Sequence, residues 1–298
     1  MCRLFAFRSI IPSQVHRSLV AADNALCEQS NRHPDGWGVA YYVDGAPHVT
    51  RSPGAAHNDQ LFHRLSGVVS SDTVLAHVRR ATVGSKTVLN CHPFQYGKWV
   101  FAHNGDVVRF AEHREALVQE IAPRLRRFIL GETDSEVVFF MFLTELEGYG
   151  PLASRHGVED VMQALRTATL RVRAICDRPG EVSVLTVITT DGATLVASRG
   201  GRELYWSTHK VRCSDRDNCA HLAPHCEAPS ESGFVNHLLF SSEQIASENV
   251  WQPLEDGDLM GVDWRMRLCH SRHERRALPL ADARDGASAP APTPGPGS

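Results

Sequence analysis

The sequence has no surplus of positive charge and no long hydrophobic run. Its 31 Lys and Arg residues are outweighed by 34 Asp and Glu residues, which gives a net charge of -3 over 298 residues. A nonspecific grip on nucleic-acid phosphates needs a cationic surface, so this composition disfavours a nucleic-acid binder. The longest purely apolar run, 137–143, is far shorter than the ~20 residues that cross a bilayer. We therefore expect neither nucleic acid nor a membrane as a partner.

The N-terminus also lacks an export signal, because the apolar stretch within residues 1–8 is too short and too charged for a signal peptide. The chain has eight cysteines, but an even count indicates a disulfide framework mainly in short secreted chains. We therefore expect a cytoplasmic protein with mostly reduced thiols.

Paired Cys-x-x-Cys knuckles, typical of structural zinc sites, are missing as well. One segment nevertheless gathers zinc-ligand residue types, and its members are Cys213, Cys219, His221, His225 and Cys226. A disulfide or incidental thiols in a surface insertion explain this cluster more simply than a metal does. Zinc binding stays open as the alternative.

Low-complexity sequence is confined to the end of the chain. From about residue 277 the composition turns to Ala, Asp, Pro and Gly, which offers nothing to bury. No comparable linker and no internal repeat occur earlier. We predict one domain over 2–270 and a flexible tail over 271–298.

The residue patterns predict an α+β fold around a single core. The predicted strands are 2–8, 37–43, 74–79, 99–103, 182–190, 193–198, 237–241 and 259–268. Tight turns at Asp44-Gly45 and Asp191-Gly192 predict two hairpins. Helices are predicted over 113–130, 134–146 and 158–176, and the apolar spacing of Val15, Leu19, Ala22 and Leu26 predicts another after Pro12.

Cys2 is the first candidate for chemistry. Removal of Met1, which a small side chain at position 2 favours, would place a free α-amino group beside a thiol in one residue. The amine has an ordinary pKa of about 7.7–8.0 and the thiol of about 8.5, so the amine is a suitable local base near neutral pH. Taken alone, a cysteine at this position also occurs by chance.

Two further motifs offer hydrogen-bond donors and a carboxylate. Asn104 and Gly105 follow a buried strand, and a side-chain amide next to a glycine N–H can form an oxyanion hole, although an ordinary Asn-Gly turn has the same sequence. Thr133 and Glu136 form a capping-box pattern for the next helix. Asp134 lies between them, where the helix dipole stabilises a carboxylate that could bind a substrate ammonium.

Adjacent arginines end the predicted strand 74–79. Side chains alternate along a strand, so Arg79 and Arg80 should point to opposite faces. One guanidinium can then face a pocket and hold a carboxylate in a bidentate pair, while the other faces solvent. Two solvated charges are the simpler alternative. Cys91 and His92 are sequence neighbours that rarely face each other, so we interpret them as parts of a structural loop.

Together these motifs resemble those of one family, the class II glutamine amidotransferases, which are N-terminal nucleophile hydrolases. The matching elements are MCR at 1–3, HPDGWG at 33–38, HVRRATVG at 77–84, NCHPF at 90–94, HNG at 103–105, TDSE at 133–136, and SSE at 241–243 followed by Trp251 and Pro253. Each motif is short, and their order and spacing over 2–268 carry the resemblance. It implies a four-layer αββα sandwich with Cys2 at the end of an inner strand.

The resemblance also implies a role for each matching residue. Cys2 would attack the side-chain carbonyl of glutamine or another γ-glutamyl amide, its own amine would serve as base, and water would release glutamate from the thioester. Asn104 and Gly105 would hold the oxyanion. Arg79, with Thr82 nearby, would bind the substrate α-carboxylate, and Asp134 the α-ammonium.

One departure concerns the loop before Asp35, where many family members carry Arg-Gly and this chain has His33-Pro34. A second catalytic domain is also not expected after residue 270. The chain therefore looks most like small stand-alone members that hydrolyse γ-glutamyl compounds, and this resemblance implies that no metal and no organic cofactor is needed. The alternatives are a glutaminase subunit that delivers ammonia to a separate synthase, and a catalytically silent zinc-binding interaction protein.

Overall fold

The computed structural model describes residues 2–213, 216–217 and 219–272. Met1 and almost all of the predicted tail lie outside these ranges. In the described part of the chain, no helix combines the length and the apolar character needed to cross a membrane. All eight cysteines are free thiols.

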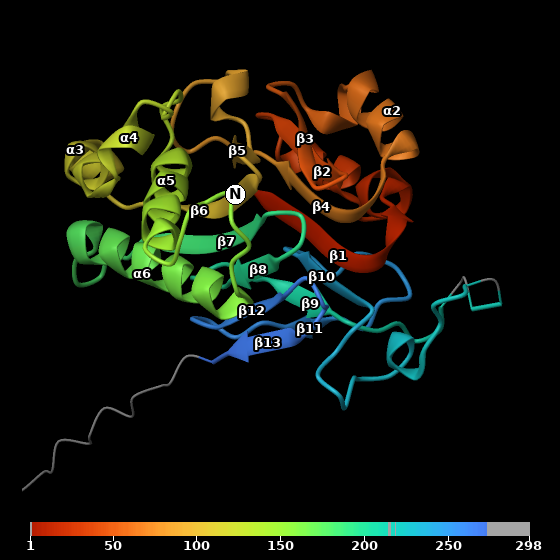
Figure 1. Cartoon of the computed structure of the whole chain (residues 1–298). Helices are drawn as coiled ribbons and strands as arrows, with labels where there is room; N and C mark the ends of the chain where they lie inside the picture. Colours follow the sequence, from red (N-terminus) through yellow and green to blue (C-terminus); the bar gives the residue numbers. More distant parts are fainter. Residues whose placement is uncertain (1, 214–215, 218, 273–298) are drawn as a thin grey trace, which may run out of the picture.

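Two antiparallel sheets form the centre of the fold (Figure 1). The first contains β1 (Arg3–Gln14), β2 (Trp37–Val43), β3 (Ala46–Ser52), β4 (Ser70–Val78), β9 (Tyr205–Ser207), β10 (His237–Ser241) and β11 (Gln252–Pro253). The second contains β5 (Phe94–Tyr96), β6 (Trp99–Asp106), β7 (Val184–Thr190), β8 (Leu195–Ser198), β12 (Leu259–Val262) and β13 (Leu268–Ser271). Their strand orders are β11-β9-β10-β1-β4-β2-β3 and β13-β12-β8-β7-β6-β5. The strand that follows Cys2 is therefore an inner strand, and both predicted hairpins are present.

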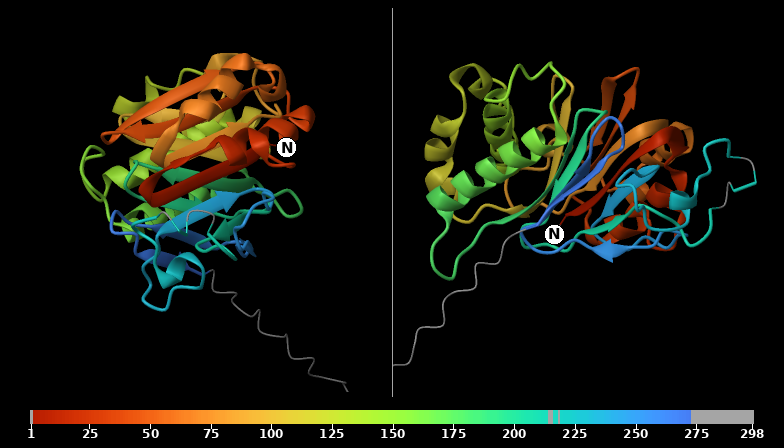
Figure 2. Two further views of the ribbon diagram at one scale, coloured as in Figure 1. Left: turned by 90° about the vertical axis from the view of Figure 1, so that its right-hand side faces the viewer. Right: turned by 60° about the horizontal axis from the view of Figure 1, so that its bottom comes forward.

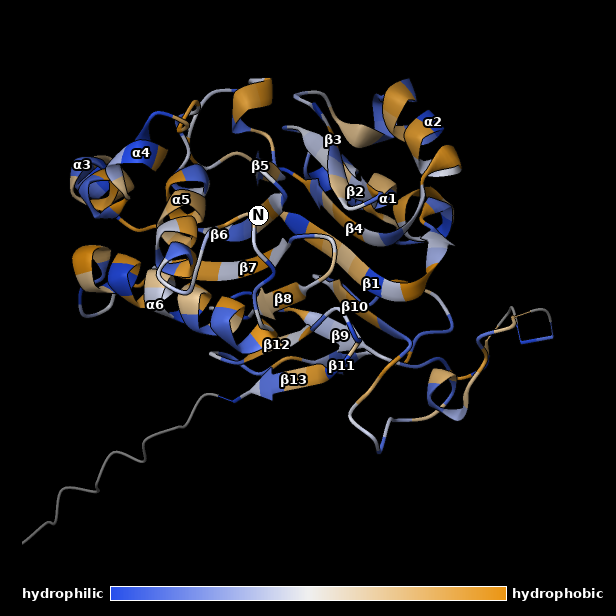
Figure 3. Cartoon of the chain, viewed as in Figure 1, coloured by the Kyte–Doolittle hydropathy of each residue, from blue (hydrophilic) through white to orange (hydrophobic). Residues whose placement is uncertain are grey.

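The α-helices are α1 (Leu26–Gln29), α2 (Gln60–Val68), α3 (Phe110–Glu120), α4 (Pro123–Arg126), α5 (Asp134–Glu147) and α6 (Val158–Cys176). A π-helical turn covers Arg17–Ala21, and 3-10 turns cover Ser30–Arg32, Ala56–Asn58, Val88–Asn90 and Pro224–Cys226. The predictions over 134–146 and 158–176 are confirmed. Hydrophilic and hydrophobic residues alternate along α6, as an amphipathic helix on a sheet requires (Figure 3).

Three predicted elements are wrong in extent or type. The helix expected after Pro12 is replaced by the end of β1, because Ser13 and Gln14 pair with β4 after a register shift, and only short helical turns follow. The helix predicted over 113–130 is divided at Pro123, which lacks an N–H and disfavours helical backbone before it. The strand predicted over 259–268 is a hairpin, and the carboxylate of Asp263 accepts backbone N–H groups in its turn.

Hydrophobic clusters define four layers. Leu4 and Ala6 of β1 belong to the cluster between the two sheets. Phe5 and Phe7, which point to the opposite face, belong to a cluster on the outer side of the first sheet that includes residues of α1 and α2. A third cluster joins the second sheet to α3, α5 and α6. Figures 1 and 2 show these helices on opposite sides of the paired sheets, so the predicted αββα sandwich is confirmed.

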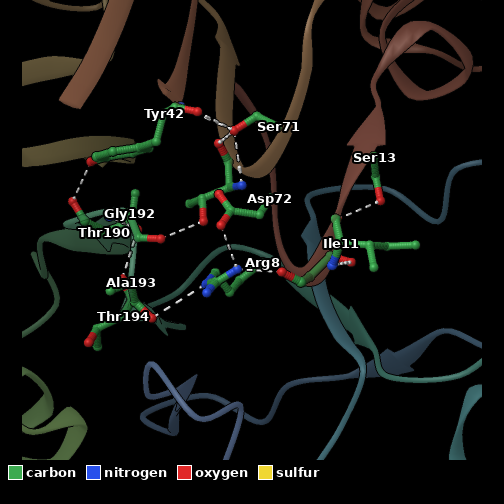
Figure 4. A network of polar contacts seen from close by, with 12 residues as sticks. Arg8, Ile11, Ser13, Tyr42, Ser71, Asp72, Thr190, Gly192, Ala193 and Thr194 are labelled. Atoms are coloured by element: carbon green, nitrogen blue, oxygen red, sulfur yellow. Dashed lines mark hydrogen bonds and ion pairs between the residues drawn. The ribbon is translucent and has the colours of Figure 1, made fainter. Parts of the chain in front are cut away.

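A polar network links the two sheets at the far end of β1 from Cys2 (Figure 4). Arg8, which is 9% exposed, forms an ion pair with Asp72 at 3.2 Å, and its Nε donates to the carbonyl of Ala193 at 3.5 Å. The hydroxyl of Tyr42 donates towards the carbonyl of Thr190 at 3.0 Å. Residues of the first sheet thus bind the turn between β7 and β8 of the second, which fixes the relation of β1 to the second sheet.

Candidate active site

Cys2 lies directly before β1, where Arg3 pairs with Val78 at the end of β4. The residue is 8% exposed, and its Sγ lies 3.4 Å from the backbone N of Arg80 and 3.5 Å from its carbonyl oxygen. Burial raises the pKa of the Cys2 thiol, and the hydrogen bond from the Arg80 backbone and the charge of Arg79 oppose that rise only in part. The sulfur is therefore a neutral thiol near pH 7 that needs a base to become a nucleophile.

The two neighbouring arginines diverge, as strand alternation predicts. Arg79 is 2% exposed, and its guanidinium donates to the carbonyls of Val83 at 2.8 Å and Ser85 at 3.2 Å. Arg80 is exposed. The buried guanidinium thus holds the loop that follows it, and the charge of Arg79 acts on the Cys2 thiol. Thr82 is exposed in the same loop, and no hydrogen bond among the described residues joins it to Cys2.

Asn104 is linked to the start of β1 through Ser242. Its Nδ2 lies 3.5 Å from Ser242 Oγ, and the same hydroxyl accepts the backbone N–H of Leu4 at 2.9 Å. Asn104 is 2% exposed, and its Oδ1 has no hydrogen-bond partner in the described structure. The Ser242 hydroxyl thus joins Asn104 to the start of β1; the sequence marked the SSE motif at 241–243 but gave Ser242 no role.

Gly105 allows β6 and β7 to approach each other closely. A Cβ at this position would lie 1.9 Å from the carbonyl oxygen of Val184, so any side chain would separate the strands. Asn104 and Gly105 pair in register with Thr186 and Leu185 on β7. The Asn-Gly pair is therefore part of a buried strand rather than an ordinary turn.

Asp134 begins α5 and is 3% exposed. Its Oδ2 accepts the backbone N–H of Val107 at 2.7 Å, and its Oδ1 accepts that of Ser135 at 2.8 Å. The negative charge of Asp134 acts on Cys2 and contributes to the raised pKa of the thiol. Oδ1 also accepts the Ser135 hydroxyl at 3.3 Å, whereas Oδ2 keeps a second lone pair that can receive a bond from a ligand.

The predicted capping box is only half present. Thr133 Oγ1 accepts the N–H of Glu136 at 3.3 Å, as a cap requires. The Glu136 carboxylate accepts the N–H groups of Leu130 and Gly131 instead of bonding back to the cap residue. Glu136 therefore closes the turn before α5, and Asp134 supports the turn after β6.

Buried histidines lie behind Arg79. The rings of His77 on β4 and His92 are 4.2 Å apart, and none of their four nitrogens has a hydrogen-bond partner among the described residues. Burial and the charge of Arg79 lower the pKa of His77 to about 3. The backbone of His103 acts in the opposite direction, but its effect on the pKa is smaller. Burial likewise lowers the pKa of His92. Both imidazoles are therefore neutral near pH 7.

The loop 33–38 supports the end of β4. Asp35 Oδ2 accepts the N–H of Ala81 at 2.9 Å, and its other oxygen forms an ion pair with Lys86. Although partial burial opposes it, bonding to Lys86 and Ala81 lowers the pKa of Asp35. Gly38, at the start of β2, permits a close approach to the segment of His92, because a Cβ there would lie 2.1 Å from the His92 carbonyl oxygen.

Two other motifs named in the sequence analysis do not belong to the group of residues around Cys2. Cys91 is fully buried, and its thiol lies 3.3 Å from the carbonyl oxygen of Thr87, in agreement with a structural loop. Cys213, Cys219 and Cys226 line a pocket beside β1 and β10. In the residues that the structure describes, no group of three or more Cys, His, Asp or Glu side chains is suited to a metal ion. His225 and Cys226 bond to Asn236 instead.

Comparison with known proteins decides the family. The model of class II glutamine amidotransferases matches residues 1–277. The chain belongs to the class II glutamine amidotransferase family. The resemblance drawn from the motifs is thereby confirmed, and so is the fold: a class II domain protein from Silicibacter pomeroyi has a TM-score of 0.61 at 22% identity, covering 91% of this chain and 98% of that one.

Two proteins with a named activity are similar to this class II amidotransferase chain. A probable glutamine amidotransferase, DUG3, from Saccharomyces cerevisiae is 34% identical over 228 residues, which span 67% of this chain and 63% of that protein. A gamma-glutamyl-hercynylcysteine sulfoxide hydrolase from Mycobacterium tuberculosis is 41% identical over 76 residues, 25% of this chain and 33% of that protein. The chain thus aligns with under two thirds of the length of either relative.

Proposed function

We propose that this chain is an amidohydrolase that uses Cys2 to cleave the γ-glutamyl amide bond of glutamine or of a small γ-glutamyl compound through a thioester. The observation that carries this proposal is the convergence on one buried thiol of two backbone groups of Arg80, the charge of Arg79 and the carboxylate of Asp134. A γ-glutamyl group carries one carboxylate, one ammonium and one amide carbonyl. The site offers a complement to each.

The first step needs a base for the thiol. Because burial keeps the Cys2 thiol protonated near pH 7, a proton must leave the sulfur as it attacks. After removal of Met1, the α-amino group of Cys2 would be the nearest base by covalent connection. It would accept the thiol proton, directly or through water, and return it to the departing nitrogen as the C–N bond breaks.

The attack places negative charge on the amide oxygen. The Nδ2 of Asn104 and the N–H of Gly105 would donate to that oxygen. Ser242 orients the Asn104 amide, and close packing against Val184 fixes the Gly105 backbone. Donors held in this way stabilise the charge without reorganising during the reaction.

The glutamyl end would bind between Arg79 and Asp134. In the ligand-free chain, carbonyls of 83–85 accept from the Arg79 guanidinium, so a substrate carboxylate would replace or add to these bonds. Water then attacks the thioester, glutamate leaves, and the Cys2 thiol is restored. Thr82 would contribute only if the loop that carries it moves towards the site.

The experiment is hydrolysis by purified full-length protein, combined with mass spectrometry after treatment with 6-diazo-5-oxo-norleucine. We expect Met1 to be absent, one label on Cys2, and loss of both label and turnover in Cys2→Ala, which should retain its fold by circular dichroism. Cys91→Ala is a matched control, because it removes another buried thiol. Undiminished turnover in Cys2→Ala, or full activity with Met1 retained, would contradict the proposal.

Partner dependence separates this function from the main alternative. A glutaminase subunit that feeds a synthase should gain activity on glutamine when its partner is added. A stand-alone hydrolase should reach full turnover without one.

A further inference from the structure

Arg80 places a free cation next to the nucleophile. Its backbone N and O lie 3.4 and 3.5 Å from Cys2 Sγ, so its side chain starts beside the reacting atom. Unlike Arg79, it is exposed. No hydrogen bond or ion pair joins its guanidinium to any residue that the structure describes. The proposed glutamyl-binding groups use the buried side of this segment and leave Arg80 without a role.

Apart from the buried Arg79, three further cations, Arg3, Lys86 and Arg32, already have anionic partners. Arg3 donates to Glu243 at 2.7 Å through its Nε and to the Cys2 carbonyl at 3.1 Å through a terminal nitrogen. Lys86 is paired with Asp35. Arg32 is 71% exposed and lies 3.9 Å from Glu243. Among Arg3, Arg32, Lys86 and Arg80, only Arg80 has no anionic partner among the described residues.

This arrangement favours an anion on one particular part of the substrate. The α-carboxylate of the γ-glutamyl group would be held at Arg79, inside the protein. Strand alternation directs the exposed Arg80 side chain to the face opposite that of Arg79, so a leaving group that extends from the scissile bond towards solvent would come near Arg80. Ammonia, which glutamine releases, has nothing for a guanidinium to bind, whereas an amino acid or peptide carries a carboxylate near the departing nitrogen.

We propose that Arg80 is a specificity-determining residue that binds the carboxylate of the leaving group, so that γ-glutamyl amino acids and peptides are preferred over neutral γ-glutamyl amides. This inference rests on the proposed function. A planar guanidinium can donate two parallel hydrogen bonds to a carboxylate, and an ammonium cannot. Arg80 gives up no internal bond when it binds the substrate.

The test compares two substrates that differ only in charge, γ-glutamylglycine and γ-glutamylglycinamide. We expect the wild-type chain to show the higher kcat/KM for the glycine compound. In Arg80→Gln the ratio of the two kcat/KM values should fall about tenfold, as expected for one charge-assisted interaction. Arg80→Lys should retain part of the preference. NaCl at 0.5 M should reduce the preference in the wild type and in Arg80→Lys, but not in Arg80→Gln.

Arg64→Gln is the matched control, because Arg64 is an exposed arginine on α2. It should leave the substrate ratio unchanged. The ratio is informative even if Arg80→Gln alters overall turnover through its backbone contact with Cys2. Equal ratios in the wild type and Arg80→Gln, with both substrates hydrolysed, overturn the role of Arg80 alone. A wild-type chain that hydrolyses glutamine but neither glycine compound also overturns the role of Arg80 alone. A wild-type chain that hydrolyses no γ-glutamyl compound, glutamine included, overturns the proposed function, and the role of Arg80 with it.

Discussion

Replacing His77 with Phe should make the protein less sensitive to acid. His77 is fully buried on β4, two residues before Arg79, and neither ring nitrogen has a hydrogen-bond partner in the described structure. Burial lowers its pKa to about 3, against about 6.5 in an unfolded chain. Phenylalanine keeps an aromatic ring beside His92 and removes the group that binds the proton.

The sign follows from proton binding in the two states. Below about pH 6.5 the unfolded chain binds a proton at His77, but the folded chain does not until the pH approaches about 3. The free energy of unfolding therefore carries no penalty from His77 above about pH 6.5, and it decreases as the pH falls through the window from about 6.5 to about 3. At pH 4.5, two pH units inside the window, the loss attributable to His77 is at most about 3 kcal/mol.

Urea unfolding, followed by tryptophan fluorescence between pH 7 and 4.5, measures this difference. We expect the free energy of unfolding of His77→Phe to fall by up to about 3 kcal/mol less than that of the wild type. Any cost of fitting phenylalanine applies at every pH and cancels in the comparison. His48→Phe, at an exposed histidine on β3, should keep the wild-type dependence. Parallel curves for His77→Phe and wild type would refute the reasoning.

Two further substitutions test the site and the fold. Asn104→Ala should lower kcat for γ-glutamyl hydrolysis by about 10²–10³ with little change in KM, because it removes an oxyanion donor; steady-state kinetics that show only a several-fold loss would exclude that role. Tyr42→Phe removes the hydroxyl that contacts the carbonyls of Lys98 and Thr190. It should reduce the free energy of unfolding in urea by about 1–2 kcal/mol, and an unchanged midpoint would mean that the link between the sheets is not stabilising.

Much of the candidate site could be predicted from the sequence, because the motifs that carry its residues are short and local. Cys2, the Asn-Gly pair and Asp134 each follow or precede an element whose apolar pattern is clear. Their roles depend on contacts between distant segments. Ser242 lies 238 positions from Leu4 along the chain and yet accepts its N–H, and no periodicity connects them.

The errors have the same origin. The apolar spacing after Pro12 fits a helix, but pairing of Ser13 and Gln14 with β4 extends the strand. Glu136 matches a capping box, but its carboxylate bonds to the turn before the helix, where two backbone N–H groups are available. Local preference was overridden in each case by hydrogen bonds that the tertiary arrangement supplies.

The sequence by itself determined the family, the strand and helix periods of the main elements, and the residue types available for chemistry, because these depend on short patterns and their order. Only the tertiary structure decided which of two adjacent arginines is buried, which hydroxyl orients Asn104, and that two imidazoles lie unpaired beside Arg79. The physical reason is that burial and hydrogen-bond partners depend on which distant segments pack together. Two arginines that are chemically identical in the sequence thereby acquire different environments, since Arg79 is buried and Arg80 is exposed.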